Sequence, residues 1–175
     1  MPPVAAFAAL SVVLIAVPGP SVLFIVGRAV AAGRRAALWT VVGNAAGVYV
    51  QVLFVAAGLG VVVERSVVAF TAIKLAGALY LVWLGLQAIR NRHVPAAVVP
   101  GDPTARRGRS VAAEGFVVGV ANPKAIVFFA AILPQYVATD GAPAAVQMAL
   151  LGLVFVALAL VLDSLWALAA GTARQ

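Results

Sequence analysis

The sequence contains no cysteine and only one histidine, His93. Without cysteine, disulfide frameworks, thiolate metal sites and cysteine nucleophiles are excluded. One histidine excludes metal sites built from several imidazoles and most histidine-based catalysis. The five Asp and Glu residues form no cluster of acids, bases or metal ligands. We therefore expect neither an enzyme nor a metal site, and no cofactor.

Charge is also scarce, because only 10% of the 175 residues are charged and 65% are apolar. A soluble domain has about 25% charged and 45–50% apolar residues, and one globule of this length could not bury the excess. The mean hydropathy of +1.12 indicates that lipid surrounds most of the surface. The net charge of +7 then indicates basic loops facing anionic lipid rather than a nucleic-acid partner.

Five long apolar runs nearly free of charge predict five helices, because a membrane span needs about 20 residues. The strands of a membrane barrel would alternate apolar and polar residues, and no segment here does. The predicted fold is an all-α, polytopic membrane helix bundle. Its predicted helices cover residues 4–32, 36–63, 66–89, 112–138 and 143–170.

The basic residues gather in alternate loops, which predicts the orientation in the membrane. Only Arg65 lies in the opposite set of loops. We therefore expect the N-terminus outside and the loop at 90–111 in the cytoplasm. This loop divides a first half (1–89) from a second half (112–175). The basic residues on the predicted cytoplasmic side are Arg28, Arg34, Arg35, Arg90, Arg92, Arg106, Arg107, Arg109 and Arg174.

Pro18-Gly19-Pro20 interrupts the first predicted helix. A proline lacks an N–H group, so the carbonyls of Leu14 and Ala16 lose their helical partners. In lipid, such groups must be satisfied by protein or by a water-filled cavity. Gly19 can then cap a second half-helix that begins at Pro20.

Asn122-Pro123-Lys124 predicts a second break, with Asn122 as N-cap and Pro123 as the first helical residue. One proline kink is commonly only structural, but these two breaks lie in corresponding spans of opposite direction. Paired broken helices of this kind indicate a transporter binding site near the midplane. Helix N-termini suit a carboxylate and freed carbonyls suit an ammonium group, so we expect a zwitterionic amino acid as ligand.

Lys124 lies about 15 Å deep at 1.5 Å per residue, where a lysine costs about 2.5–3.5 kcal/mol on insertion scales. It would hold a substrate carboxylate or balance Asp163, a carboxylate inside the last predicted span. Asp163 is the candidate for proton coupling, with a purely interfacial position beside Trp166 as the alternative. Asn44 is a further polar residue in a span and a candidate for lining the site.

Several motifs keep the order and spacing of a known family over nearly the whole chain. The chain resembles the lysine exporter (LysE) family of bacteria, specifically its homoserine/threonine-exporter branch. The motifs are Pro18-Gly19-Pro20, Gly43 with Gly47, Lys74 to Leu81 with Gly85, Gly115-Phe116, Asn122-Pro123-Lys124-Ala125, Phe128-Phe129, Leu133-Pro134-Gln135, and Asp163 with Trp166.

The resemblance implies an inner-membrane exporter of amino acids or close derivatives, driven by proton antiport and built from inverted three-helix repeats. The chain departs from this pattern, because the sixth helix of the family is missing after Gln175. The alternative is a truncated, non-transporting subunit that packs with a full-length partner. A homo-oligomer or a partner subunit would then complete the bundle.

Overall fold

The computed structural model describes residues 2–65, 68, 71, 72, 75, 79, 108–139 and 141–172. All regular elements in these ranges are helical, which confirms the all-α prediction. Apart from isolated positions, the predicted helix at 66–89 and the loop at 90–107 lie outside the described residues. The elements are α1 (Pro2–Ala16), α2 (Pro20–Ala32), α3 (Arg34–Arg65), α5 (Gly108–Val120), α6 (Pro123–Ile132), the 3-10 turn η1 (Leu133–Tyr136) and α7 (Ala144–Thr172).

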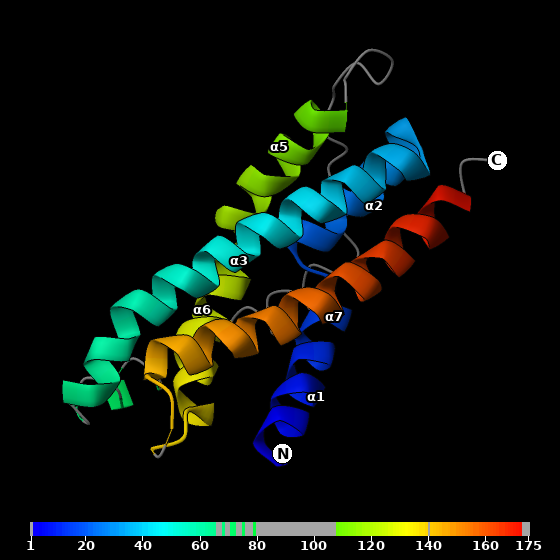
Figure 1. Cartoon of the computed structure of the whole chain (residues 1–175). Helices are drawn as coiled ribbons and strands as arrows, with labels where there is room; N and C mark the ends of the chain where they lie inside the picture. The colour runs from blue at the N-terminus through cyan, green and yellow to red at the C-terminus, as the bar shows by residue number, and fades with distance from the viewer. Residues whose placement is uncertain are drawn as a thin grey trace.

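Two helices and two bent pairs have the length and composition of membrane spans. Arg34–Gly58 within α3 covers 25 residues, and α7 covers 29. The axes of α1 and α2 differ by 52°, and those of α5 and α6–η1 differ by 50°. Each bent pair therefore qualifies as one broken span, which confirms the membrane helix bundle (Figure 1). Helix α5 begins at Gly108 rather than at 112, because exposed, polar Arg109 and Ser110 extend it beyond the apolar run.

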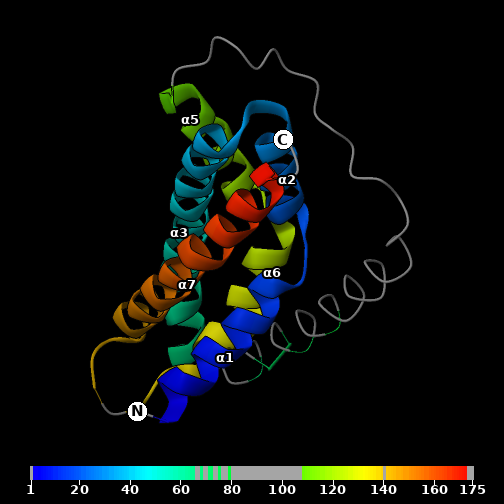
Figure 2. The ribbon, with the colours of Figure 1, turned by 90° about the vertical axis from the view of Figure 1, so that its right-hand side faces the viewer.

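The two bent spans run in opposite directions through the bundle (Figure 2). Arg28 in the second half of α2 pairs with Glu114 in the middle of α5. At the other end, the ring of Phe7 in α1 lies 5.6 Å from that of Tyr136, just after α6. This antiparallel arrangement is what an inverted repeat requires, whereas the repeat boundaries at 89 and 112 stay predictions.

Helices α3 and α5 lie in backbone contact along two small-residue motifs, Gly43-x-x-x-Gly47 and Gly115-x-x-x-Gly119. A Cβ atom added at Gly43 would lie 1.8 Å from the carbonyl oxygen of Ala112. A Cβ atom at Gly119 would lie 2.3 Å from the carbonyl oxygen of Asn44. Lipid removes the hydrophobic drive between helices, so close packing of this kind stabilises the bundle.

Two apolar clusters lie on opposite sides of the helix breaks. The larger contains buried aromatic rings, with Phe129 and Phe155 only 4.8 Å apart in an edge-to-face arrangement. The smaller contains Ile25, Ala29, Ala37, Val41 and Ala167. The breaks therefore lie between a thick aromatic layer and a thinner aliphatic layer.

We expect Gly43→Ala to lower the stability of the bundle by about 1–3 kcal/mol, the usual cost of overpacking. Its Cβ atom would displace the backbone of α5. Gly58→Ala in the same helix is the matched control, because a Cβ atom there meets none of the described residues within 4 Å. Thermal unfolding in detergent, followed by tryptophan fluorescence, measures the difference. Equal melting temperatures of the two variants would contradict the close contact between α3 and α5.

Candidate functional site

The first break separates α1 from α2 at the predicted residues. Gly19 is the N-cap of α2 in an extended conformation, with φ −129° and ψ −172°, and Pro20 begins the helix. Glycine has no side chain to cap the first turn, and no side-chain cap hydrogen bond is formed there. Because Pro18 has no N–H group, the carbonyl of Leu14 has lost its helical donor.

The second break, at Asn122, confirms the predicted cap. The side-chain oxygen of Asn122 accepts a hydrogen bond from the backbone N–H of Lys124 at 3.1 Å. Pro123 occupies the first turn of α6, where its missing N–H costs nothing. Gln51 of α3 donates to the carbonyls of Val120 and Asn122, at 2.6 and 3.0 Å. The backbone of this break is therefore satisfied by a side chain from a neighbouring helix.

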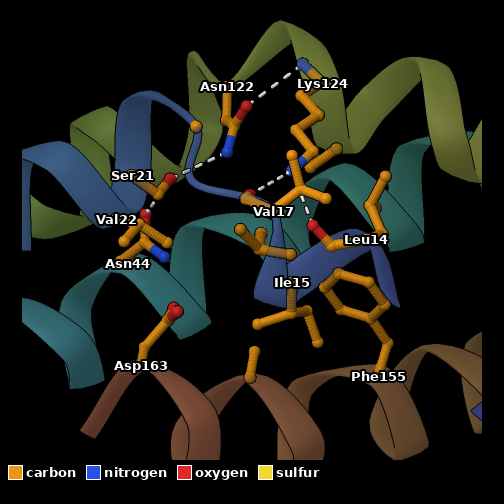
Figure 3. Close-up of a pocket in the computed structure, with 14 residues that line it drawn as sticks. Leu14, Ile15, Val17, Ser21, Val22, Asn44, Asn122, Lys124, Phe155 and Asp163 are labelled. Carbon is orange, nitrogen blue, oxygen red and sulfur yellow. Dashed lines mark hydrogen bonds between the residues drawn. The ribbon is translucent and has the colours of Figure 1, made fainter. Parts of the chain in front are cut away.

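Lys124 links the two breaks. Its ammonium donates to the carbonyl of Leu14 at 2.6 Å and to the carbonyl of Val17 at 2.7 Å (Figure 3). Its side chain crosses Gly19, where a Cβ atom would lie 3.2 Å from Cδ of Lys124. The carbonyl freed by one proline therefore receives its hydrogen bond from a lysine at the other break.

Ser21 connects three helices, and the sequence reasoning missed it. Its hydroxyl donates to Oδ1 of Asn44 at 2.8 Å and accepts from Nδ2 of Asn122 at 2.7 Å. All three side chains are buried. The available signal was a small hydroxyl residue directly after Pro20, in the first turn of a half-helix and ahead of an apolar run at 22–26.

These residues surround a cavity of about 40 Å³. It can hold two or three water molecules, because each needs about 10–15 Å³. Of the predicted site residues, Gly19, Asn44, Asn122, Lys124 and Asp163 line the cavity, whereas Pro18, Pro20 and Pro123 shape the breaks beside it. The other lining residues are Leu14, Ile15, Val17, Ser21, Val22, Val48, Ala125, Phe155 and Ala159.

Asp163 projects from α7 toward the same cavity (Figure 3). Only 4% of the residue is exposed, and its Oδ1 atom has no hydrogen-bond partner. The ion pair between Asp163 and Lys124, which the sequence suggested, is not formed. Within the described residues, the salt bridge that is formed joins Arg28 and Glu114. The physical reason is that the carbonyls of Leu14 and Val17 already hold the ammonium.

Arg28 lies in the last part of α2, not in the following turn as predicted. Its guanidinium pairs with the carboxylate of Glu114 on α5 and lies 5.2 Å from the ring centre of Phe24. Both charged side chains are mostly buried, with 14% and 29% exposure. The pair joins the two bent spans beside the smaller apolar cluster, whose members Ile25 and Ala29 flank Arg28 along α2.

Comparison with known proteins identifies the family that this arrangement represents. Residues 12–175 match the model of the LysE type translocator. The chain belongs to the LysE family. No solved structure matches the chain.

Several curated proteins are similar to this chain. A threonine efflux protein of Escherichia coli K12 is 33% identical over 69% of the chain and 59% of its own length. A homoserine/homoserine lactone efflux protein of Salmonella typhi is 34% identical over 69% and 57%. An uncharacterized membrane protein of Vibrio cholerae is 32% identical over 73% and 61%. The match therefore spans about three fifths of these relatives.

We expect Ser21→Ala to lower stability by about 1–3 kcal/mol, because it leaves buried polar groups of Asn44 and Asn122 without a partner. Ser11→Ala is the matched control. Ser11 is also buried, but its hydroxyl bonds only to the carbonyl of Phe7 in its own helix. Thermal unfolding in detergent should show a lower melting temperature for Ser21→Ala than for Ser11→Ala. The opposite order would contradict the linking role of Ser21.

Proposed function

We propose that this member of the LysE family exports amino acids or close derivatives, and that its substrate binds where the two breaks face each other. One observation carries this proposal: freed backbone carbonyls and an uncapped helix N-terminus meet at one cavity that several polar side chains also line. Membrane proteins accept irregular backbone at this depth only where it is buried in protein or lines a cavity. The efflux functions named for the relatives support the same conclusion.

The first break offers complementary groups to both ends of a zwitterion. The carbonyls of Leu14 and Val17 are acceptors for an α-ammonium group. The first turn of α2 has no side-chain cap, and Ser21 and Val22 of this turn line the cavity. Its N–H groups and positive dipole end favour a carboxylate.

Of these two contacts, the contact with the ammonium group can serve more of the relevant substrates than the contact with the carboxylate. Homoserine and homoserine lactone, both named for the Salmonella typhi relative, share a free ammonium group, but the lactone has no free carboxylate. We therefore assign the carbonyls of Leu14 and Val17 as the main recognition groups. The N-terminal turn of α2 is the secondary one.

Transport requires the bundle to rearrange, because the cavity of about 40 Å³ is too small for an amino acid. The aromatic cluster around Phe129 and Phe155 lies on one side of the breaks. The smaller apolar cluster lies on the other side. The two bent spans are the elements that would move.

The proposed location is the bacterial inner membrane, with the N-terminus outside and the loop at 90–111 in the cytoplasm. This orientation is supported by the basic residues that lie at one end of the bundle. Arg34 lies against Gly171, and Arg28 and Arg109 lie in the neighbouring ends of α2 and α5. Such an end is expected to face the cytoplasm.

We expect cells that express the protein to release threonine or homoserine faster after they are loaded with dipeptides containing these amino acids. Lys124→Ala should abolish the net release, because the first break then lacks its bound ammonium in the empty protein. The measurement is the intracellular and external amino-acid content over time. Unchanged amino-acid levels with a well-expressed protein would refute the exporter and favour the non-transporting subunit.

Asp163 is the proposed site of proton coupling, because it is a buried carboxylate in the cavity with an unpaired oxygen atom. We expect Asp163→Asn to make efflux from vesicles insensitive to an imposed proton gradient, while exchange of internal for external substrate persists. The amide has nearly the same shape but does not titrate. Gradient-driven efflux at the wild-type rate would contradict this role.

A further inference from the structure

The acceptors that suit a substrate ammonium are already occupied by an ammonium of the protein. Nζ of Lys124 lies 2.6 Å from the carbonyl oxygen of Leu14 and 2.7 Å from that of Val17. Both carbonyls belong to the first break, whereas Lys124 belongs to the second. The contact is therefore made across the cavity, between the two bent spans.

The side chain of Lys124 and a substrate cannot share this position. The lysine chain fills the space over Gly19, and the remaining cavity holds only a few water molecules. An incoming ammonium must therefore displace that of Lys124 before it can reach the two oxygens. The exchange replaces one charged hydrogen-bond donor by another, so the net charge at these oxygens is conserved.

The displaced ammonium has an acceptor within the same cavity. Oδ1 of Asp163 is buried and lacks a hydrogen-bond partner. Figure 3 shows this carboxylate and the lysine chain approaching the first break from different helices, α7 and α6. A buried, unpaired carboxylate oxygen is costly, so a partner that arrives when substrate enters would lower this cost.

We propose that the ammonium of Lys124 is a tethered substitute for the substrate's α-ammonium, which the substrate displaces toward Asp163. The inference rests on the proposed function, and it adds that recognition needs a free ammonium group. In the empty protein the lysine satisfies the freed carbonyls, which lipid cannot satisfy. The lysine thereby lets the empty carrier stay closed and change its orientation.

This competition has a measurable consequence for affinity. If the lysine occupies the carbonyls in about nine of ten empty molecules, the apparent dissociation constant of the substrate is raised about tenfold. Removing the lysine should therefore strengthen substrate binding, although it should abolish net efflux. If Lys124 instead contacted the substrate carboxylate directly, its removal would weaken binding.

The first experiment tests the ammonium position without any need for transport. Lys124→Ala deletes the atoms from Cγ to Nζ, and n-propylammonium supplies the same chain of three carbons and one nitrogen. We expect n-propylammonium to raise the melting temperature of the purified variant and to leave the wild type unchanged. Tetramethylammonium, which has the same charge but no N–H group, is the matched control. Absence of a difference between the two cations would overturn the inference.

The second experiment compares amino-acid binding by wild type and variant through the same thermal shift. We expect L-threonine to stabilise Lys124→Ala at about tenfold lower concentration than the wild type, and N-acetyl-L-threonine to stabilise neither. Tighter binding of threonine by the wild type would overturn the inference but leave the exporter intact. A different outcome is that no amino acid changes the melting temperature of either protein, while n-propylammonium still stabilises the variant. The proposed function then fails, and the role of Lys124 as a substitute for the substrate fails with it.

Gly19→Ala provides a second variant in case Lys124→Ala does not fold. Its Cβ atom would lie 3.2 Å from Cδ of Lys124. This close contact weakens the hydrogen bonds from the lysine to the two carbonyls, while every polar group is kept. Its backbone conformation is open to alanine, because φ is −129°. We expect threonine to bind this variant more tightly than the wild type. Equal or weaker binding would contradict displacement of the lysine.

Discussion

The arrangement of the molecule depends on satisfying backbone groups that proline has freed inside lipid. A broken membrane helix exposes carbonyl oxygens that lipid cannot satisfy, and each unsatisfied group costs several kcal/mol. Here the freed carbonyls at each break accept hydrogen bonds from a side chain outside their own span. Lys124 bonds to the carbonyls of the first break, and Gln51 bonds to those of the second. The two bent spans therefore depend on each other and on α3.

The remaining contacts divide the bundle into a tightly packed part and a polar part. Helices α3 and α5 meet through glycines at backbone distance, which leaves little freedom for sliding. At the breaks, by contrast, contact between the bent spans passes through single polar side chains such as Ser21 and Lys124. Hydrogen bonds between side chains can exchange partners, whereas packed backbones cannot. Movement during transport is therefore expected where the bent spans meet.

The cavity combines stability with the capacity to respond to a ligand. Its groups are nearly all satisfied, since Asn44, Ser21, Asn122 and Lys124 form a continuous set of hydrogen bonds. The unpaired oxygen of Asp163 is an exception. A satisfied network with one unpaired carboxylate can be rearranged by a charged molecule. Such a molecule must offer the same hydrogen bonds as the group that it replaces.

The sequence by itself determined the helical class, the described spans and the position of both breaks. Runs without charge predict membrane helices, and proline and asparagine have local effects that need no knowledge of neighbours. The capping role of Asn122 and the start of α2 at Pro20 followed in the same way. The glycine motifs likewise indicated close contact, although they did not say which helices would meet.

Only the tertiary structure decided which groups from different spans are partners. Lys124 bonds to Leu14 and Val17 rather than to Asp163, because the bend of 52° brings these carbonyls within reach of the lysine. Ser21 is central because three helices converge on it, and Arg28 finds Glu114 because two helices meet. These contacts join residues far apart along the chain. Periodicity and composition record only the local environment of a residue, so they cannot specify such partners.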